Sequence, residues 1–311
     1  TKTLTGDNIV AGTITVSDSA IFDASNYVFG GAGTNITMTG TSVYRLSGSG
    51  LKPDATGIYS LTPGTTFEFY EAFGTTIRTG VSSPVIAYSN VIVSGTNVSN
   101  PNTTDGIQFQ SGGKFTVKSG AAFKLFNTSG FNGNATAAVS SNNNPTIVLE
   151  PGSLIEYGGA SQTVTLFNSP YYSNVTISGT GIKSLQNATQ TFINEDLNIN
   201  GGVLLVNTNE VLTVRKAVKI ATVVTTDIPD FQIKNNAQLI QIDETDANSG
   251  INAKVERIAT VNKNDYVYWS SPTDGFDMAT IPSSGSRRYI WNTTFVNLNG
   301  TQGNWNGASG A

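Results

Sequence analysis

The sequence predicts an all-β protein, with a right-handed parallel β-helix (a β-solenoid) over residues 1–242 and the start of a β-sandwich-like module over residues 243–311. Three observations lead to this fold class. A heptapeptide recurs along the chain, apolar and polar residues alternate with a period of two, and short turns rich in Gly, Asn, Ser and Thr separate the alternating segments. Repetition indicates stacked units, and the alternation shows that these units are strands.

The heptapeptide has the form Asn-apolar-x-apolar-Ser/Thr-Gly-Thr. Its copies start 55 and 84 residues apart, close to two and three multiples of about 28 residues, and a fixed period predicts turns that bury their apolar faces against one another. We therefore expect about eight or nine turns, with the heptapeptides stacked in register. The copies are NITMTGT (35–41), NVIVSGT (90–96) and NVTISGT (174–180).

Alternation within one unit predicts three short strands per turn. In residues 203–220, Gly201-Gly202 and Asn207-Thr208-Asn209 supply breaks where positive φ or side-chain bonding to the backbone is favourable. An antiparallel sandwich with chance similarity between short strands is the alternative. The expected inward positions are Leu204, Val206, Leu212, Val214, Val218 and Ile220.

A longer match relates residues 63–125 to residues 151–214, with offsets of 88 and 89 residues. It places Glu68 and Glu156 at the same point of two copies, so we expect both to be structural and solvent-facing, and not a catalytic pair. The Asn that begins each heptapeptide is expected to stack in a ladder or to adopt the left-handed conformation at a corner.

The pattern changes at the polar segment 243–250, after which charged and aromatic residues are more frequent and all three Trp residues occur. We expect residues 243–311 to form a separate, incomplete module of a longer multidomain protein, and to carry any binding function. A strand at 251–257 would cover the open sheet edges at the end of the solenoid.

Composition argues against several classes of function. The net charge of −4 disfavours nucleic acid as a partner, and no apolar run approaches the roughly 18 residues of a membrane-spanning helix. The chain has no Cys and no His, which excludes disulfides, thiolate metal sites and a Ser–His–Asp triad. We therefore expect no cofactor, with calcium as the one metal to consider.

Two strings carry a resemblance to a known family: IEYGGASQTVTLFNSPYYSNVTISGTGIKSL (155–185) and NNAQLIQIDETDANSGINAKVERIATVNKNDYVYWSSP (235–272). They resemble large secreted surface proteins of Bacteroidetes, particularly flavobacteria, in which such repeats build a β-helical stalk. The resemblance implies an extracellular, cell-surface protein exported by type IX secretion, with adhesive or surface-layer roles and in some members a link to gliding. Its implied partners are an extracellular glycan, a surface partner or the secretion machinery.

Candidate sites are few. The acidic group Asp243, Glu244 and Asp246 offers hard oxygen ligands for calcium but lacks EF-hand spacing, so a solvated turn is the alternative. Ser19, in Asp18-Ser19-Ala20, resembles the short O-glycosylation acceptor of Bacteroidetes. Aromatic side chains that could stack on a glycan are Tyr171, Tyr172, Trp269 and Trp291, with packing at corners as the alternative for the two tyrosines.

Two function classes therefore compete. The favoured one is a non-catalytic structural or adhesive protein whose solenoid is a stalk or binding surface. The alternative is a β-helical lyase or hydrolase acting on polysaccharides. Such lyases generally need clustered carboxylates that hold Ca²⁺, together with a Lys or Arg base, and no such cluster occurs within the repeats.

Overall fold

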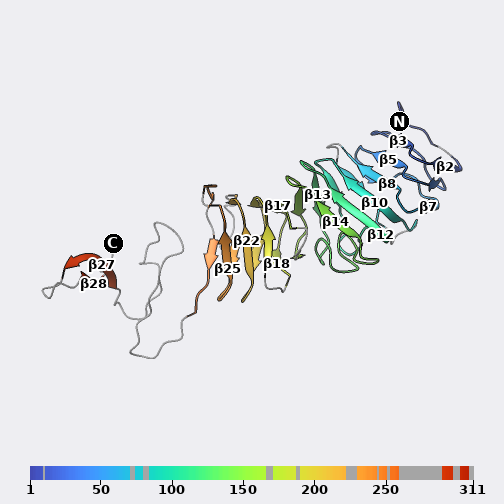
Figure 1. Ribbon diagram of the computed structural model, residues 1–311. Helices are drawn as coiled ribbons and strands as arrows, with labels where there is room; N and C mark the ends of the chain where they lie inside the picture. The colour runs from blue at the N-terminus through green and yellow to red at the C-terminus, as the bar shows by residue number, and fades with distance from the viewer. Residues whose placement is uncertain are drawn as a thin grey trace. The chain divides into compact units, whose positions relative to one another are not determined.

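The computed structural model describes residues 1–9, 11–70, 74–79, 84–165, 171–186, 190–221, 230–243, 245–250, 253–258, 289–296 and 302–307. The chain divides into two compact units, Thr1–Ile258 and Ala259–Ala311. The regular structure of the described residues is all β-strand. The larger unit is a parallel β-solenoid of about 10 turns, which confirms the predicted solenoid (Figure 1).

Two long sheets contain most of the strands. Sheet I has the order β1 (Lys2–Thr3), β3 (Ile21–Asp23), β5 (Val43–Leu46), β8 (Thr66–Phe69), β10 (Ala87–Val93), β12 (Gln108–Val117) and β14 (Thr146–Leu149). Sheet II has the order β6 (Gly50–Lys52), β9 (Thr75–Ile77), β11 (Val98–Asn100), β13 (Ala122–Leu125), β15 (Leu154–Tyr157), β17 (Asn174–Ile177), β20 (Leu197–Ile199) and β23 (Val218–Ile220).

Three shorter sheets complete the solenoid. Sheet III contains β16 (Gln162–Val164), β18 (Ile182–Leu185), β21 (Val203–Val206), β24 (Phe231–Ile233) and β26 (Ala253–Val255). Sheet IV contains β19 (Thr191–Ile193), β22 (Val211–Val214) and β25 (Gln238–Gln241), and sheet V contains β2 (Thr13–Val16), β4 (Asn35–Met38) and β7 (Tyr59–Leu61). In the second unit, β27 (Tyr289–Val296) and β28 (Gln302–Gly307) form an antiparallel pair.

Only some turns of the solenoid use the predicted three strands, because from β8 to β15 the described strands alternate between sheets I and II alone. The consecutive strands β7, β8 and β9 belong to sheets V, I and II, and β18, β19 and β20 belong to sheets III, IV and II. Described pairs within the solenoid are parallel, for example β8 with β10 and β17 with β20. This parallel pairing rules out the antiparallel sandwich.

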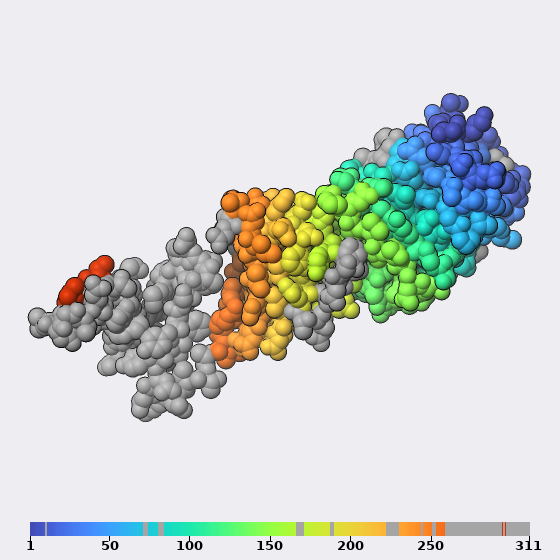
Figure 2. Space-filling model, in the orientation of Figure 1, coloured from blue at the N-terminus to red at the C-terminus, as the bar shows by residue number. Residues whose placement is uncertain are grey.

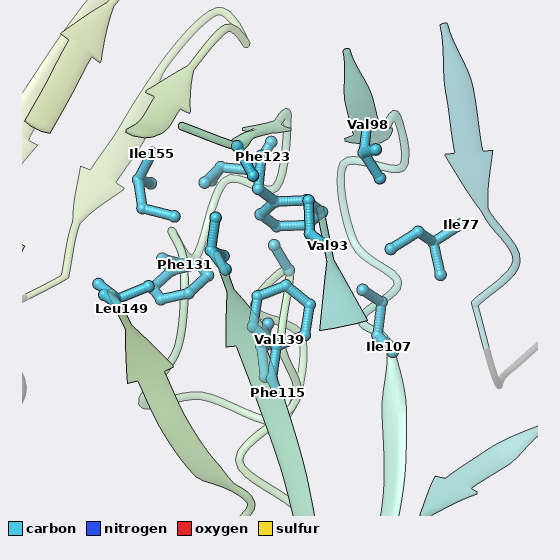
Figure 3. Packing of buried hydrophobic residues seen from close by; sticks show 14 of the residues in the cluster. Ile77, Val93, Val98, Ile107, Phe115, Phe123, Phe131, Val139, Leu149 and Ile155 are labelled. Carbon is cyan, nitrogen blue, oxygen red and sulfur yellow. The ribbon is translucent and has the colours of Figure 1, made fainter. Parts of the chain in front are cut away.

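The alternating residues of each strand meet in one hydrophobic core. Val93 and Phe115 from sheet I point into the same interior as Val98 and Phe123 from sheet II, and all four are fully buried (Figure 3). Aromatic rings continue from turn to turn, with centroids 5.4 Å apart for Tyr44 and Phe67 and 5.1 Å apart for Phe67 and Tyr88. The core therefore runs along the stacking direction, and each turn depends on its neighbours.

The heptapeptides do not stack on one another, which corrects the predicted register. Residues 35–38 lie in β4 of sheet V, 90–93 in β10 of sheet I, and 174–177 in β17 of sheet II. The two apolar positions of the motif are nevertheless buried in all three copies: Ile36, Met38, Val91, Val93, Val175 and Ile177. The motif thus specifies a strand and the corner after it, and this strand can belong to any of sheets I, II and V.

The Asn that begins the motif has a role that neither predicted alternative describes. Asn35 Oδ1 accepts a hydrogen bond from the backbone N–H of Ile58 at 2.7 Å, and Asn174 Oδ1 accepts one from Asp196 at 3.2 Å. Neither asparagine has a positive φ; that conformation belongs to Gly179, at the end of one copy, where φ is 72°. In these two of the three copies, the Asn side chain therefore ties its strand to the start of the next rung.

The prediction of a fixed repeat period is also wrong. Along sheet II, Phe123 pairs with Ile155, and Ile155 pairs in turn with Val175, so the first of these two turns is more than half as long again as the second. The strands from β13 to β17 each have three or four residues, so the difference lies in the corners, where surface loops tolerate insertions at small entropic cost. The chain makes about 10 turns, more than the predicted number.

The match between residues 63–125 and 151–214 does correspond to shared contacts. Gly64 N–H donates to Ser89 Oγ at 2.8 Å, and Gly152 N–H donates to Ser173 Oγ at 2.7 Å. In each case a Pro-Gly turn is joined to the residue before a heptapeptide in the next rung. The two copies nevertheless lie on different faces, because β8 belongs to sheet I and β15 to sheet II.

The solenoid extends beyond residue 242, so the boundary expected there is placed too early in the chain. Ala253–Val255 pair in parallel with Phe231–Ile233, and the first compact unit ends at Ile258. The strand expected to begin a new module is thus a further rung of sheet III, and Ser249 in the polar segment before it bridges Lys219 of sheet II in parallel. Figure 2 shows the described turns as successive bands of colour, ending in orange near this rung.

Candidate functional site

The outer face of sheet I carries the clearest candidate site. In β12 the apolar side chains of Phe115 and Val117 point into the core, so Lys114, Thr116 and the following Lys118 face outward. Parallel pairing then sets equivalent side chains of neighbouring strands side by side at a spacing of about 4.8 Å. The sequence alternation thus produces a patterned surface across β8, β10, β12 and β14.

This surface contains a shallow hollow of about 200 Å³, which we call the sheet I trough. Ile92, Thr116 and Val148 are paired across three rungs and form its middle line. Polar side chains from the same strands flank that line on both sides. The full set of lining residues is Thr66, Asn90, Ile92, Lys114, Thr116, Lys118, Val148 and Glu150.

A bulge in β12 sets one edge of the trough. Tyr88 pairs with Phe109 whereas Asn90 pairs with Lys114, so residues 110–113 stand opposite a single residue of β10. Gly113 is required here, because a Cβ atom would approach the backbone oxygens of Gln110 and Ser89 to 2.9 Å. Bulges re-aim the side chains next to them, and Lys114 is the first residue after this one.

The charges of the trough are unequal. Lys118 Nζ lies 2.7 Å from Glu150 Oε1, and Ser119 N–H donates to Glu150 Oε2 at 3.1 Å. These two hydrogen bonds, with the charges of Lys118 and Lys114, hold the pKa of the Glu150 carboxyl below its usual value. Lys114 is exposed and has no ion pair among the described residues, so the lining carries one excess positive charge.

Carboxylates elsewhere on the outer faces are held in ladders of ion pairs. Glu68 accepts from Arg45 Nε at 2.9 Å and from Ser94 Oγ at 2.7 Å. Glu156 lies 2.6 Å from Lys124 Nζ and accepts from Ser178 Oγ at 2.6 Å. The two glutamates expected to be structural therefore make the same pair of contacts, each joining three successive rungs.

Of the four aromatic candidates, the structure describes the side chains of the two tyrosines, and these differ in exposure. Tyr171 is 43% exposed, and its ring lies 4.7 Å from that of Phe192, tilted by 38°. Tyr172 is fully buried and its hydroxyl lies 2.6 Å from that of Tyr157, so the prediction of glycan contact is wrong for Tyr172. Trp269 and the side chain of Trp291 lie outside the described residues.

The acidic group near residue 243 forms a local turn. Asp243 Oδ1 accepts from the backbone N–H of Thr245 at 3.1 Å and from its hydroxyl at 2.7 Å, which lowers the pKa of Asp243. Asp246 lies in the same corner, whereas Glu244 is outside the described residues. Within the described part of the chain, no three acidic side chains are grouped to hold a metal. The calcium site stays a prediction.

Ser19 lies in an exposed turn between β2 and β3. The preceding residue, Asp18, has a φ of 58°, and Ala20 N–H donates to Ser17 O at 3.0 Å to close the turn. The hydroxyl is therefore on the surface, and its O-glycosylation stays a prediction.

The sequence analysis missed a buried ionisable residue, Lys183 in β18. Its side chain is fully buried, and Nζ donates to the carbonyl oxygens of Gly159 at 2.7 Å and Thr180 at 2.6 Å. No carboxylate within the described residues pairs with it, and burial lowers the pKa of Lys183 to about 8. The alternation in this strand could have revealed the buried lysine, because Lys183 and Leu185 are two residues apart and therefore point to the same side.

Comparison with known proteins gives one match. Residues 167–311 match a family described as a domain of unknown function, DUF8693. This region takes in the later turns of the solenoid and the second compact unit, so it crosses the boundary at residue 258. No curated protein and no solved structure matches the chain. No helix in the described residues is long and apolar enough to cross a membrane.

Proposed function

We propose that the protein is a non-catalytic scaffold of the cell surface or the secreted fraction, whose solenoid is a stalk that presents a binding surface. The state of its outward carboxylates supports this proposal most directly. Seven of them form ion pairs between rungs: Asp23 and Glu68 with Arg45, Glu150 with Lys118, Glu156 with Lys124, Glu195 with Lys216, Asp196 with Lys219, and Glu256 with Lys234.

Carboxylates paired in this way stabilise the contact between successive turns and are poorly suited to acid–base catalysis. A general acid needs a raised pKa near neutral pH, yet hydrogen bonds and lysine charges lower the pKa of Glu150, Asp196 and Glu256. Burial raises the pKa of Glu210, but this residue is 2% exposed and its carboxylate accepts from Asn207 N–H at 2.7 Å within a turn. A substrate would not reach it.

The proposed location rests on the resemblance of residues 155–185 and 235–272 to secreted surface proteins of Bacteroidetes. Export by type IX secretion, adhesion, attachment within a longer multidomain protein and contact with an extracellular glycan or surface partner are parts of the same proposal. Labelling intact cells of the source organism with an antibody to residues 1–258 tests it. Surface labelling is expected, and labelling only after lysis would contradict the location.

We expect the full chain to release no product from pectin, alginate, xylan or host glycans. Reducing ends and unsaturated uronates would be measured over a long incubation, because the paired carboxylates provide neither a proton donor nor a grouped metal site in the described residues. Release above the blank that disappears in Glu150→Gln would instead support the alternative of a polysaccharide lyase or hydrolase.

A further inference from the structure

We propose that the sheet I trough binds an acidic carbohydrate, with the Lys114 ammonium contacting an anionic group of the sugar. The inference rests on the proposed binding function and adds to it a place and a ligand class. It also places the binding surface on the solenoid, whereas the sequence alone led us to expect it in residues 243–311.

The middle line of the trough suits the apolar face of a pyranose ring. Ile92 and Val148 are partly exposed. Thr116 between them is only 3% exposed, so it does not protrude from the floor of the trough. Sugar-binding surfaces combine such apolar area with a few placed polar groups. Here the polar groups are the Asn90 amide and the Thr66 hydroxyl, which line the same side as Lys114.

Charge selects an acidic sugar over a neutral one. Lys118 is neutralised by Glu150 at 2.7 Å, whereas Lys114 has no ion pair among the described residues. The chain as a whole carries a net charge of −4, so this positive site is local and does not reflect a general attraction for anions. Charge-assisted hydrogen bonds to a carboxylate or sulfate are stronger than neutral ones.

The geometry of the rungs suits a chain of sugars better than a single one. Equivalent side chains recur about every 4.8 Å across β8, β10, β12 and β14, a distance close to the length of one pyranose unit. A hollow of about 200 Å³ holds only part of such a chain, so the ligand would extend beyond it along the sheet. A short oligosaccharide is therefore the appropriate probe.

The test is calorimetric titration of the full chain with oligogalacturonate, a sulfated chondroitin oligosaccharide and neutral xylo-oligosaccharide. We expect an acidic probe to bind more tightly than the neutral one, and the two acidic probes distinguish a carboxylate from a sulfate. Lys114→Gln should weaken acidic binding about tenfold. Lys2→Gln is the matched control, because Lys2 is exposed on β1 of the same sheet but outside the trough.

Three results would overturn the inference: no binding of either acidic probe, equal binding of the neutral probe, or equal weakening by the Lys2 and Lys114 variants. None of them bears on the non-catalytic proposal. Conversely, binding that Lys114→Gln weakens, accompanied by cleavage of the probe, would support the trough and contradict the proposed non-catalytic function.

Discussion

Replacing Ile177 by Asp is expected to lower the free energy of unfolding by more than about 3 kcal/mol, because it buries a charge without a partner. Ile177 is fully buried in β17, paired with Tyr157 on one side and Ile199 on the other. Since each turn buries its apolar face only against adjacent turns, damage to one rung weakens both neighbouring interfaces. Thermal unfolding followed by circular dichroism measures the effect.

Two further variants separate the inward position from a general effect of substitution. Asn198→Asp adds the same acid on the outward side of β20 and should change stability by less than about 0.5 kcal/mol. Ile177→Val keeps an apolar side chain and should lower stability by about 1 kcal/mol. An unchanged melting temperature for Ile177→Asp would contradict the inward assignment.

The second large effect is a dependence of stability on pH that originates at Lys183. Burial lowers the pKa of this group to about 8 in the folded chain, against an ordinary value of 10.5. The unfolded chain therefore binds more protons between these values, so stability rises with pH in that interval and the gain is lost as pH falls through 8. From pH 7 to 9.5 the expected gain is about 2 kcal/mol.

Measurement should stop at pH 9.5, because burial raises the pKa of Tyr44, Tyr88 and Tyr172, and their ionisation in the unfolded chain lowers stability at higher pH. Lys183→Met should abolish the rise, whereas Lys124→Met, at a surface ion pair with Glu156, should retain it. An equal rise in wild type and Lys183→Met would show that another group is responsible.

The sequence was sufficient to predict the strands and which of their residues point inward. It was not sufficient to predict the face of the solenoid on which each strand lies. Alternation identified Leu204, Val206, Leu212 and Val214 as inward positions, and all four are buried, because the direction of a side chain is a local property of a strand. The face on which a strand lies depends on the summed lengths of all preceding corners. The corners between β13 and β15 are much longer than those between β15 and β17, and a repeat period cannot reveal such a difference.

The trough was not predictable for the same reason. Its lining comes from positions spread between Thr66 and Glu150, which become neighbours only once four strands are paired in register. The individual residues are unremarkable in the sequence, since Lys, Thr and Asn are frequent on outer faces. By contrast, Tyr172 was proposed as a glycan contact from its residue type alone. Its side chain points into the core and is fully buried, so the proposal failed.

Disulfide trapping tests the register of the solenoid most directly. The chain has no native cysteine, so only the introduced pair can form a disulfide within the chain. Ile92 and Thr116 are Cα partners on the outer face, and the spacing of about 4.8 Å between paired strands lies within the roughly 4.4–6.8 Å that a disulfide allows. Ile92→Cys with Thr116→Cys should therefore cross-link on mild oxidation. Ile92→Cys with Thr176→Cys should not, because these residues lie in sheets I and II. The reverse result, with 92 and 176 linked and 92 and 116 free, would contradict the three-faced solenoid and the trough built on it.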